Sequence, residues 1–68
     1  MCESNIYIVA PGQEDDAGVL FLEAVDELLP EGDNAWRVTS IFGEQKILNG
    51  RIRSMHLVDH RIIFERSA

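Results

Sequence analysis

RIRSMHLVDHRIIFE, residues 51–65, contains two apolar segments joined by Asp59 and His60. Apolar side chains recur along the first segment but change face once, as a β-bulge produces, at Ile52, Met55, Leu57 and Val58. Aspartate and histidine are among the few residue types other than glycine that tolerate a positive φ angle, so a tight hairpin fits between the two segments. The stretch therefore predicts two strands, residues 51–58 and 61–65, with a two-residue connection between them.

The segments upstream continue this pattern of short strands separated by turn-forming residues. Residues 5–10 are rich in β-branched and aromatic side chains and stop at Pro11-Gly12. Residues 36–42 alternate as a strand does, and residues 45–48 are followed by a break at Asn49-Gly50. Such spacing is typical of a small meandering sheet or barrel. We expect the aromatic side chains to pack in its core: Tyr7, Phe21, Trp36, Phe42 and Phe64.

Residues 19–29 are ambiguous between a helix and a strand. Leu22, Val25 and Leu29 have helical spacing, and good helix formers lie between them. The continuous apolar run of residues 19–22 suits a buried strand instead. The periodicity by itself favours a helix slightly, and the turn formers that follow end the segment.

Residues 12–18 are polar and flanked by glycines, which predicts an exposed loop. Its acidic residues, Glu14, Asp15 and Asp16, lack the alternating oxygen ligands of a calcium loop. We therefore expect a solvated loop at this position rather than a site for a hard metal ion.

The chain has 68 residues and is expected to form one small domain, residues 1–68, with a thin core. Small scaffolds usually need a disulfide, a metal ion or oligomerisation to be stable. A single cysteine excludes an internal disulfide and fits a reducing compartment.

Because neither a signal peptide nor a membrane span is recognisable, we expect a cytoplasmic protein. Twelve acidic against six basic residues give a formal net charge of -6, which argues against nucleic acid as the main partner.

The single cysteine is Cys2, directly after the initiator methionine. Removal of Met1, which a small second residue normally permits, would leave a free α-amine beside the thiolate. Sulfur and amine nitrogen form a five-membered chelate that the next backbone nitrogen can extend, and a planar N/S set suits Ni(II) or Cu(II). One chain offers too few donors for a closed site, so two termini meeting across a dimer would complete it. The alternative is that Cys2 is an idle thiol or a small apolar residue.

His56, Asp59 and His60 form the other cluster with ligand chemistry. We expect them to lie at a strand end and a turn, which would spoil a shared metal geometry. The serine and threonine hydroxyls have no nearby pattern of histidine and carboxylate that predicts a nucleophile and its base. The scattered glycines form no phosphate-binding loop. The sequence therefore predicts a protein that is not an enzyme.

Several segments, in their order and spacing, resemble the CooT family of small nickel-binding proteins. These segments are MCES (residues 1–4), LEAV (22–25), PEGD (30–33), IFGEQK (41–46) and LVDHRIIFE (57–65). The resemblance covers the chain apart from the loop at residues 12–18 and the last few residues.

The resemblance implies a homodimeric, all-β protein. We expect a small meandering antiparallel sheet that closes into a six- to seven-stranded SH3-like barrel. It also implies nickel handling during maturation of carbon monoxide dehydrogenase, with Ni(II) bound through Cys2 at or near the dimer interface, as in a metallochaperone. For the ambiguous segment it favours two short strands, residues 20–22 and 26–29, around a bend at Glu23-Ala24.

An alternative function is a small β-barrel module that binds RNA or another protein. Arg51, Arg53 and Arg61 are close in sequence and would line its contact face. Small barrels do bind oligonucleotides on the faces of their sheets, although the negative charge of this chain counts against nucleic acid. A third alternative is a redox-responsive dimer linked through Cys2.

Overall fold

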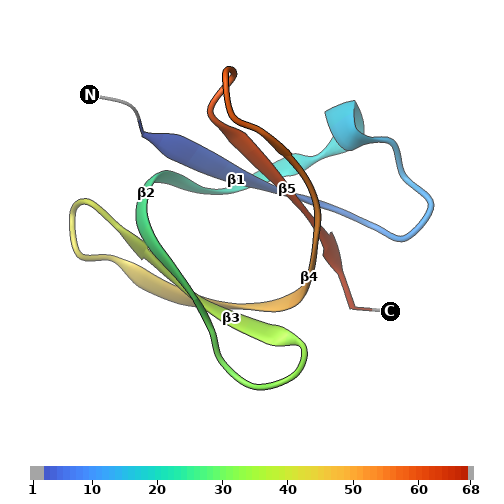
Figure 1. Cartoon of the computed structure of the whole chain (residues 1–68). Helices are drawn as coiled ribbons and strands as arrows, with labels where there is room; N and C mark the ends of the chain where they lie inside the picture. The colour runs from blue at the N-terminus through green and yellow to red at the C-terminus, as the bar shows by residue number, and fades with distance from the viewer. Residues whose placement is uncertain (1–2, 68) are drawn as a thin grey trace.

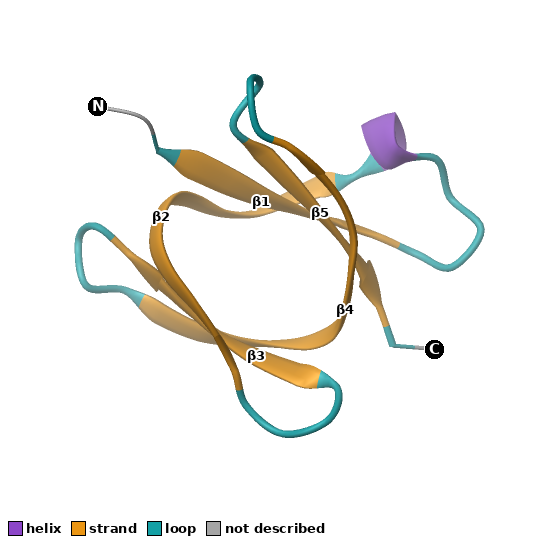
Figure 2. Cartoon of the chain, viewed as in Figure 1, coloured by secondary structure: helices purple, strands orange, loops and turns teal. Residues whose placement is uncertain are grey.

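The computed structural model describes residues 3–67, which form strands and very little helix (Figure 1). The strands are β1 (Ser4–Val9), β2 (Val19–Pro30), β3 (Ala35–Ser40), β4 (Gln45–His56) and β5 (Arg61–Arg66). A short 3-10 turn, η1 (Asp15–Ala17), interrupts the loop between β1 and β2 (Figure 2). The predicted all-β class is confirmed.

The five strands form a closed ring, which Figure 1 shows along its axis. Consecutive strands pair in antiparallel fashion, and β1 closes the ring by pairing with β5 in parallel. The prediction of six to seven strands is wrong, because two long strands each form two sides of the ring. β2 pairs first with β1 and then with β3, while β4 pairs first with β3 and then with β5. The SH3-like arrangement stays a prediction.

The ambiguous segment is neither a helix nor two separate strands, because β2 is continuous over Val19–Pro30. Its change of direction lies at Ala24, whose φ angle of 54° is in the left-handed region. The pairing of β2 with β3 shifts register between Val25 and Glu27. The predicted bend is therefore present, but it lies within one strand that passes from β1 to β3.

The β4–β5 connection is longer than predicted. The register shift expected for a bulge is present between Ile52 and Ser54. β4 ends at His56, however, so the connection comprises residues 57–60 rather than two residues. His60 has the positive φ angle expected of it, 57°, and donates its N–H to the carbonyl oxygen of Leu57 at 3.4 Å. The apolar residues Leu57 and Val58 therefore lie in a turn and are exposed.

The predicted break at Asn49-Gly50 is wrong, because β4 passes through both residues. Asn49 pairs with Ala35 of β3, and Gly50 pairs with Arg66 of β5, so this is the point at which β4 changes partner. A Cβ atom at Gly50 would collide with the backbone carbonyl oxygen of Glu65. Glycine is needed here for the close approach of two strands and not for a turn.

We expect Gly50→Ala to lower the free energy of unfolding by about 1 to 3 kcal/mol, the usual cost of forcing extra atoms into a packed site. Urea unfolding followed by circular dichroism would measure the change. Gly32→Asn is the control for backbone strain alone, because the space around Gly32 is open and only its positive φ angle opposes a side chain. Equal stability of Gly50→Ala and the wild-type protein would contradict the close approach of β4 and β5.

The core lies inside the ring and takes a side chain or more from every strand. Its buried members are Ile6, Leu22, Val38, Leu48, Ile62 and Phe64. Trp36 packs edge-on against Phe64, with ring centroids 5.7 Å apart, and its indole N–H donates to the carbonyl oxygen of Gly50. Phe42 departs from the predicted aromatic core, since it lies in the β3–β4 turn and is 83% exposed.

Candidate functional site

The predicted metal ligand, Cys2, lies outside the residues that the structure describes. The described chain begins at Glu3, beside a hollow of about 560 Å³. Four segments line this N-terminal hollow: the start of the chain, the β2 bend, the β3–β4 turn and the β4–β5 turn. Their lining residues are Glu3, Asn5, Glu23, Ala24, Phe42 and His60. Glu3 directly follows Cys2 in the sequence, so the N-terminal hollow includes the described residue that is adjacent to the cysteine.

Asn5 joins the segments that form the hollow. Its backbone N–H donates a hydrogen bond to the carbonyl oxygen of His60 at 2.8 Å. Its side-chain Oδ1 accepts a hydrogen bond from the N–H of Ala24 at 3.0 Å. The carbonyl oxygen of Ala24 in turn accepts from the N–H of Ile41 at 2.8 Å. The start of β1 is therefore held to the β2 bend and to the β4–β5 turn.

The N-terminal hollow has carboxylate and imidazole donors, from Glu3, Glu23 and His60. Within residues 3–67, however, no group of three or more histidine, cysteine or carboxylate side chains is placed to hold a metal ion. The thiolate and nitrogen donors of Cys2 are the ones whose chemistry suits Ni(II). The described residues of the hollow therefore form no metal site of their own.

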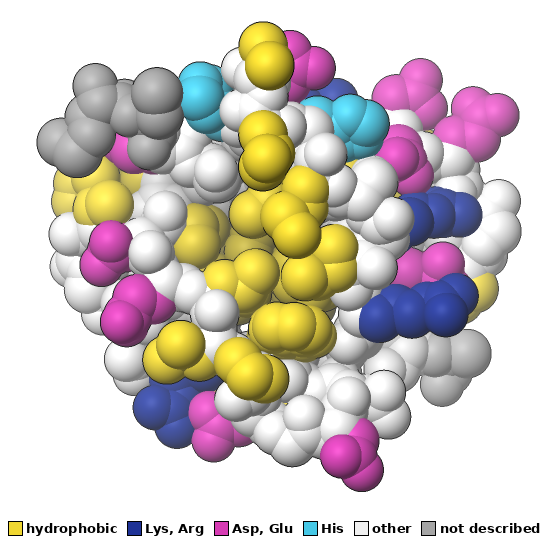
Figure 3. Space-filling model, in the orientation of Figure 1, with side chains coloured by type: hydrophobic (Ala, Val, Ile, Leu, Met, Phe, Trp, Pro, Cys, Tyr) yellow, Lys and Arg dark blue, Asp and Glu magenta, His cyan; other side chains and the backbone are white. Residues whose placement is uncertain are grey.

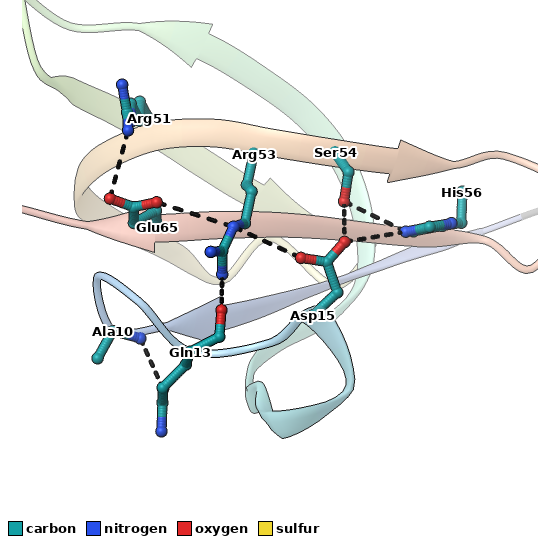
Figure 4. A network of polar contacts seen from close by, with 8 residues as sticks. All are labelled: Ala10, Gln13, Asp15, Arg51, Arg53, Ser54, His56 and Glu65. Carbon is teal, nitrogen blue, oxygen red and sulfur yellow. Dashed lines mark hydrogen bonds and ion pairs between the residues drawn. The ribbon is translucent and has the colours of Figure 1, made fainter.

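His56 lies at the end of β4 and His60 in the β4–β5 turn, as predicted, and the two histidines have different surroundings. His60 lines the hollow, whereas Nε2 of His56 lies 3.5 Å from Oδ2 of Asp15 and 3.2 Å from Oγ of Ser54 (Figure 4). The Ser54 hydroxyl is 2.7 Å from the same Asp15 oxygen. This is not a catalytic triad, because a triad places the histidine between hydroxyl and carboxylate and uses a different ring nitrogen for each.

The acidic loop is attached to β4 rather than fully solvated (Figure 4). Arg53 donates to the carbonyl oxygen of Gln13, and its Nε lies 3.5 Å from Oδ1 of Asp15. The hydrogen bond from Ser54 is the main cause that lowers the pKa of Asp15 below its ordinary value, while desolvation opposes the shift and His56 and Arg53 add to it. Sequence reasoning missed this contact, because Asp15 and Ser54 are 39 residues apart and no local pattern links them.

The lowered pKa of Asp15 means that its contacts stabilise the folded loop at neutral pH. This contribution is lost as the pH falls through the folded-state pKa, below about pH 4. We expect Asp15→Asn to speed amide hydrogen exchange in residues 10–18 at pH 7 while the ring stays folded. Asp16→Asn, one residue along η1, is the control. Equal exchange in the two variants would show that Asp15 does not hold the loop.

The arginines of the predicted basic face have acidic or aromatic partners. Guanidinium nitrogens of Arg51 and Arg53 lie 3.4 Å and 3.8 Å from carboxylate oxygens of Glu65. The guanidinium carbon of Arg61 lies 4.7 Å from the ring centroid of Tyr7. Binding to phosphates relies on cations that neutralise them, and two of these charges already face a carboxylate. The structure therefore adds no support for an RNA-binding face.

Comparison with known proteins decides the family. The family model described as CO dehydrogenase accessory protein CooT matches residues 1–65. The chain belongs to the CooT family. A crystal structure from Carboxydothermus hydrogenoformans, provisionally assigned as CooT, is 39% identical in sequence and superposes with a TM-score of 0.81. That similarity covers 98% of this chain and 100% of the other. No curated protein matches the chain.

Membership of the CooT family confirms the resemblance seen in the sequence, and the matched region includes Cys2. The family places the protein in an accessory role for CO dehydrogenase. An accessory protein is not itself the catalyst, in agreement with the prediction that this chain is not an enzyme. Within residues 3–67, no helix has the length and apolar character required to cross a membrane.

Proposed function

We propose that this CooT protein is a nickel-binding accessory protein or metallochaperone, which binds Ni(II) through Cys2 at or near a homodimer interface. Its client would be a nickel enzyme such as carbon monoxide dehydrogenase. The family match over residues 1–65 is the observation that carries this proposal. The hollow beside Glu3 supports it, because additional carboxylate and imidazole donors gather next to the start of the chain.

The chemistry of the proposed site follows from the donors of Cys2. The thiolate supplies a soft ligand, and the terminal amine or the local backbone nitrogens complete a planar set suited to Ni(II). The thiol and the nitrogens must lose protons before they coordinate, so nickel affinity rises with pH. A site at the end of the chain also suits a carrier, which must release its metal as well as bind it.

The exposed apolar surface supports a homodimer. Figure 3 shows apolar side chains in a band over the open end of the ring, reaching the β4–β5 turn. In that turn Leu57 is 69% and Val58 91% exposed, and in the β3–β4 turn Phe42 is 83% exposed. An exposed apolar patch of this kind marks an interaction site. A second copy would cover it and bring a second Cys2 to the nickel ion.

A cytoplasmic location belongs to the same proposal. Cys2 binds nickel as a thiolate, so it must be kept from forming a disulfide. Free thiols persist in the reducing cytoplasm.

Nickel titration combined with light scattering tests the proposal. We expect a dimer in solution whose ultraviolet absorption gains sulfur-to-nickel charge-transfer bands that saturate as nickel is added. A monomer that gains no such bands at any nickel concentration would contradict it.

A further inference from the structure

The β3–β4 turn presents an exposed phenylalanine on an ordered backbone. Phe42 is 83% exposed, whereas Ser40, at the end of β3, is only 3% exposed. The Ser40 hydroxyl oxygen accepts hydrogen bonds from the backbone N–H groups of Phe42 and Glu44, both at 3.2 Å. The Ser40 carbonyl oxygen accepts a third, from the N–H of Gly43 at 3.0 Å. Because these bonds already fix the turn, little conformational freedom is lost when the phenyl ring binds a partner.

An apolar groove of about 260 Å³ adjoins Phe42, which is one of its lining residues. Its apolar walls come from β2, at Leu20, Phe21 and Leu22, and we call it the β2 groove. Leu20 is 45% exposed, so these walls are open to solvent. Pockets for drug-sized ligands have about 300 to 1,000 Å³, and the smaller β2 groove suits a single side chain. An apolar projection and an apolar groove therefore lie next to each other on one surface.

The rim of the β2 groove carries both signs of charge, from Glu23, Glu44 and Lys46. The Lys46 ammonium is held there, because it donates to the carbonyl oxygen of Phe21 at 3.2 Å and lies 5.1 Å from the centroid of its ring. Its ion pair with Glu44, at 3.8 Å, is exposed and therefore weak. A surface for an acidic or a basic partner would carry mainly one sign. A rim with both signs, beside a projection and a groove, instead matches a second copy of the same surface.

We infer that Phe42 is the anchor of a two-fold contact between two copies of this chain, in which each phenyl ring occupies the β2 groove of the other copy. The inference rests on the proposed function, whose homodimer it assigns to a specific surface. In a two-fold contact every pair of residues meets twice, so Lys46 of each copy faces Glu23 of the other. Aromatic side chains are enriched at the cores of such interfaces.

Truncation of the anchor tests the contact. We expect Phe42→Ala to raise the dissociation constant of the dimer by about 30-fold or more, the usual effect of truncating a central interface side chain. Leu29→Ala is the matched control, because Leu29 is as exposed as Leu20 but lies near the other end of β2, and it should change the constant by less than about 3-fold. Sedimentation equilibrium of the metal-free protein would measure the constants, with circular dichroism to show that each variant folds.

An exchange of charges tests the two-fold pairing itself. Lys46→Glu and Glu23→Lys each place like charges opposite one another at two points, so each variant alone should be monomeric. An equal mixture of the two variants restores opposite charges at both points, and native mass spectrometry should then detect the mixed dimer. Asp33→Lys makes the same change of charge as Glu23→Lys in the β2–β3 turn, away from the groove, and should dimerise as the wild-type protein does.

The outcomes separate this contact from the proposed function. A Phe42→Ala protein that dimerises as tightly as wild type would overturn the contact, and so would a mixture of the charge variants that stays monomeric. Either result would leave nickel binding through Cys2 at another dimer interface standing. A wild-type chain that is monomeric with and without nickel would overturn the contact and the proposed homodimer, and would assign the surface to a different protein. Nickel titration of Cys2→Ser would then decide the metal-binding role separately.

Discussion

Cys2→Ser is expected to lower nickel affinity more than about 100-fold, because even the partners that orient a metal ligand change affinity by about 10- to 100-fold. The hydroxyl of serine is nearly the same size as the thiol but is a hard donor that stays protonated at neutral pH. Soft sulfur is the donor that selects late transition metals. Equilibrium titration, followed by charge-transfer absorption and by calorimetry, would measure the difference.

His56→Asn is the control for this experiment. His56 is the imidazole paired with Asp15 and Ser54, away from the residues that line the N-terminal hollow. We expect its replacement to leave nickel affinity unchanged. If Cys2→Ser retained nickel affinity and His56→Asn lost it, the result would show that nickel binds at the acidic loop instead of at Cys2.

The intact mass of the purified protein gives a separate test of the donor set. Loss of Met1 exposes the α-amine of Cys2, which can then close a five-membered ring with the thiolate around nickel. We expect the mature mass to lack one methionine. Retention of Met1 would exclude the amine as a donor and leave the thiolate with backbone nitrogens.

Phe64→Ala has the largest expected effect on stability, about 3 to 5 kcal/mol, the usual cost of truncating a buried phenylalanine. Phe64 is fully buried and packs against Trp36 at the centre of the core. A core in a chain of this size seldom contributes more than about 3 to 5 kcal/mol of net stability. The variant should therefore be largely unfolded at room temperature, as urea or thermal unfolding would show.

Phe42→Ala makes the same chemical change in an exposed turn and is the matched control. Because Phe42 is 83% exposed, we expect its truncation to change the stability of the monomer by less than about 0.5 kcal/mol. Any larger effect should depend on protein concentration, since it would come from the proposed dimer. A Phe64→Ala protein with the wild-type unfolding midpoint would contradict the placement of Phe64 in the core.

The parts of the fold that the sequence predicted are those fixed by local patterns. The bulge near Arg53 and the positive φ angle at His60 follow from side-chain parity and residue type, and both are present. The break predicted at Asn49-Gly50 is wrong because this dipeptide is compatible with a turn and also with a close contact between strands. The contact that decides between them is with Glu65, which is distant in the sequence. Tertiary context likewise overrode the helical periodicity of β2.

In the candidate site, too, the residues with a local sequence signal were predicted and those that depend on distant contacts were not. Cys2 stands out by its position in the sequence and by its family, and its role stays a prediction because it lies outside the described residues. The pairing of Asp15 with His56 joins residues 41 positions apart, which no spacing rule could predict. The role of Asn5 in joining these segments could not be predicted, because an asparagine near the end of a strand is common. Its partners, Ala24 and His60, are distant in the sequence.

X-ray absorption at the nickel K edge of the nickel-loaded protein asks most directly whether sulfur at the start of the chain binds the metal. We expect sulfur and nitrogen neighbours in a planar arrangement around Ni(II), with the sulfur contribution absent from Cys2→Ser. Nickel in the wild-type protein surrounded only by oxygen and nitrogen donors, in six-coordinate geometry, would contradict nickel binding through Cys2.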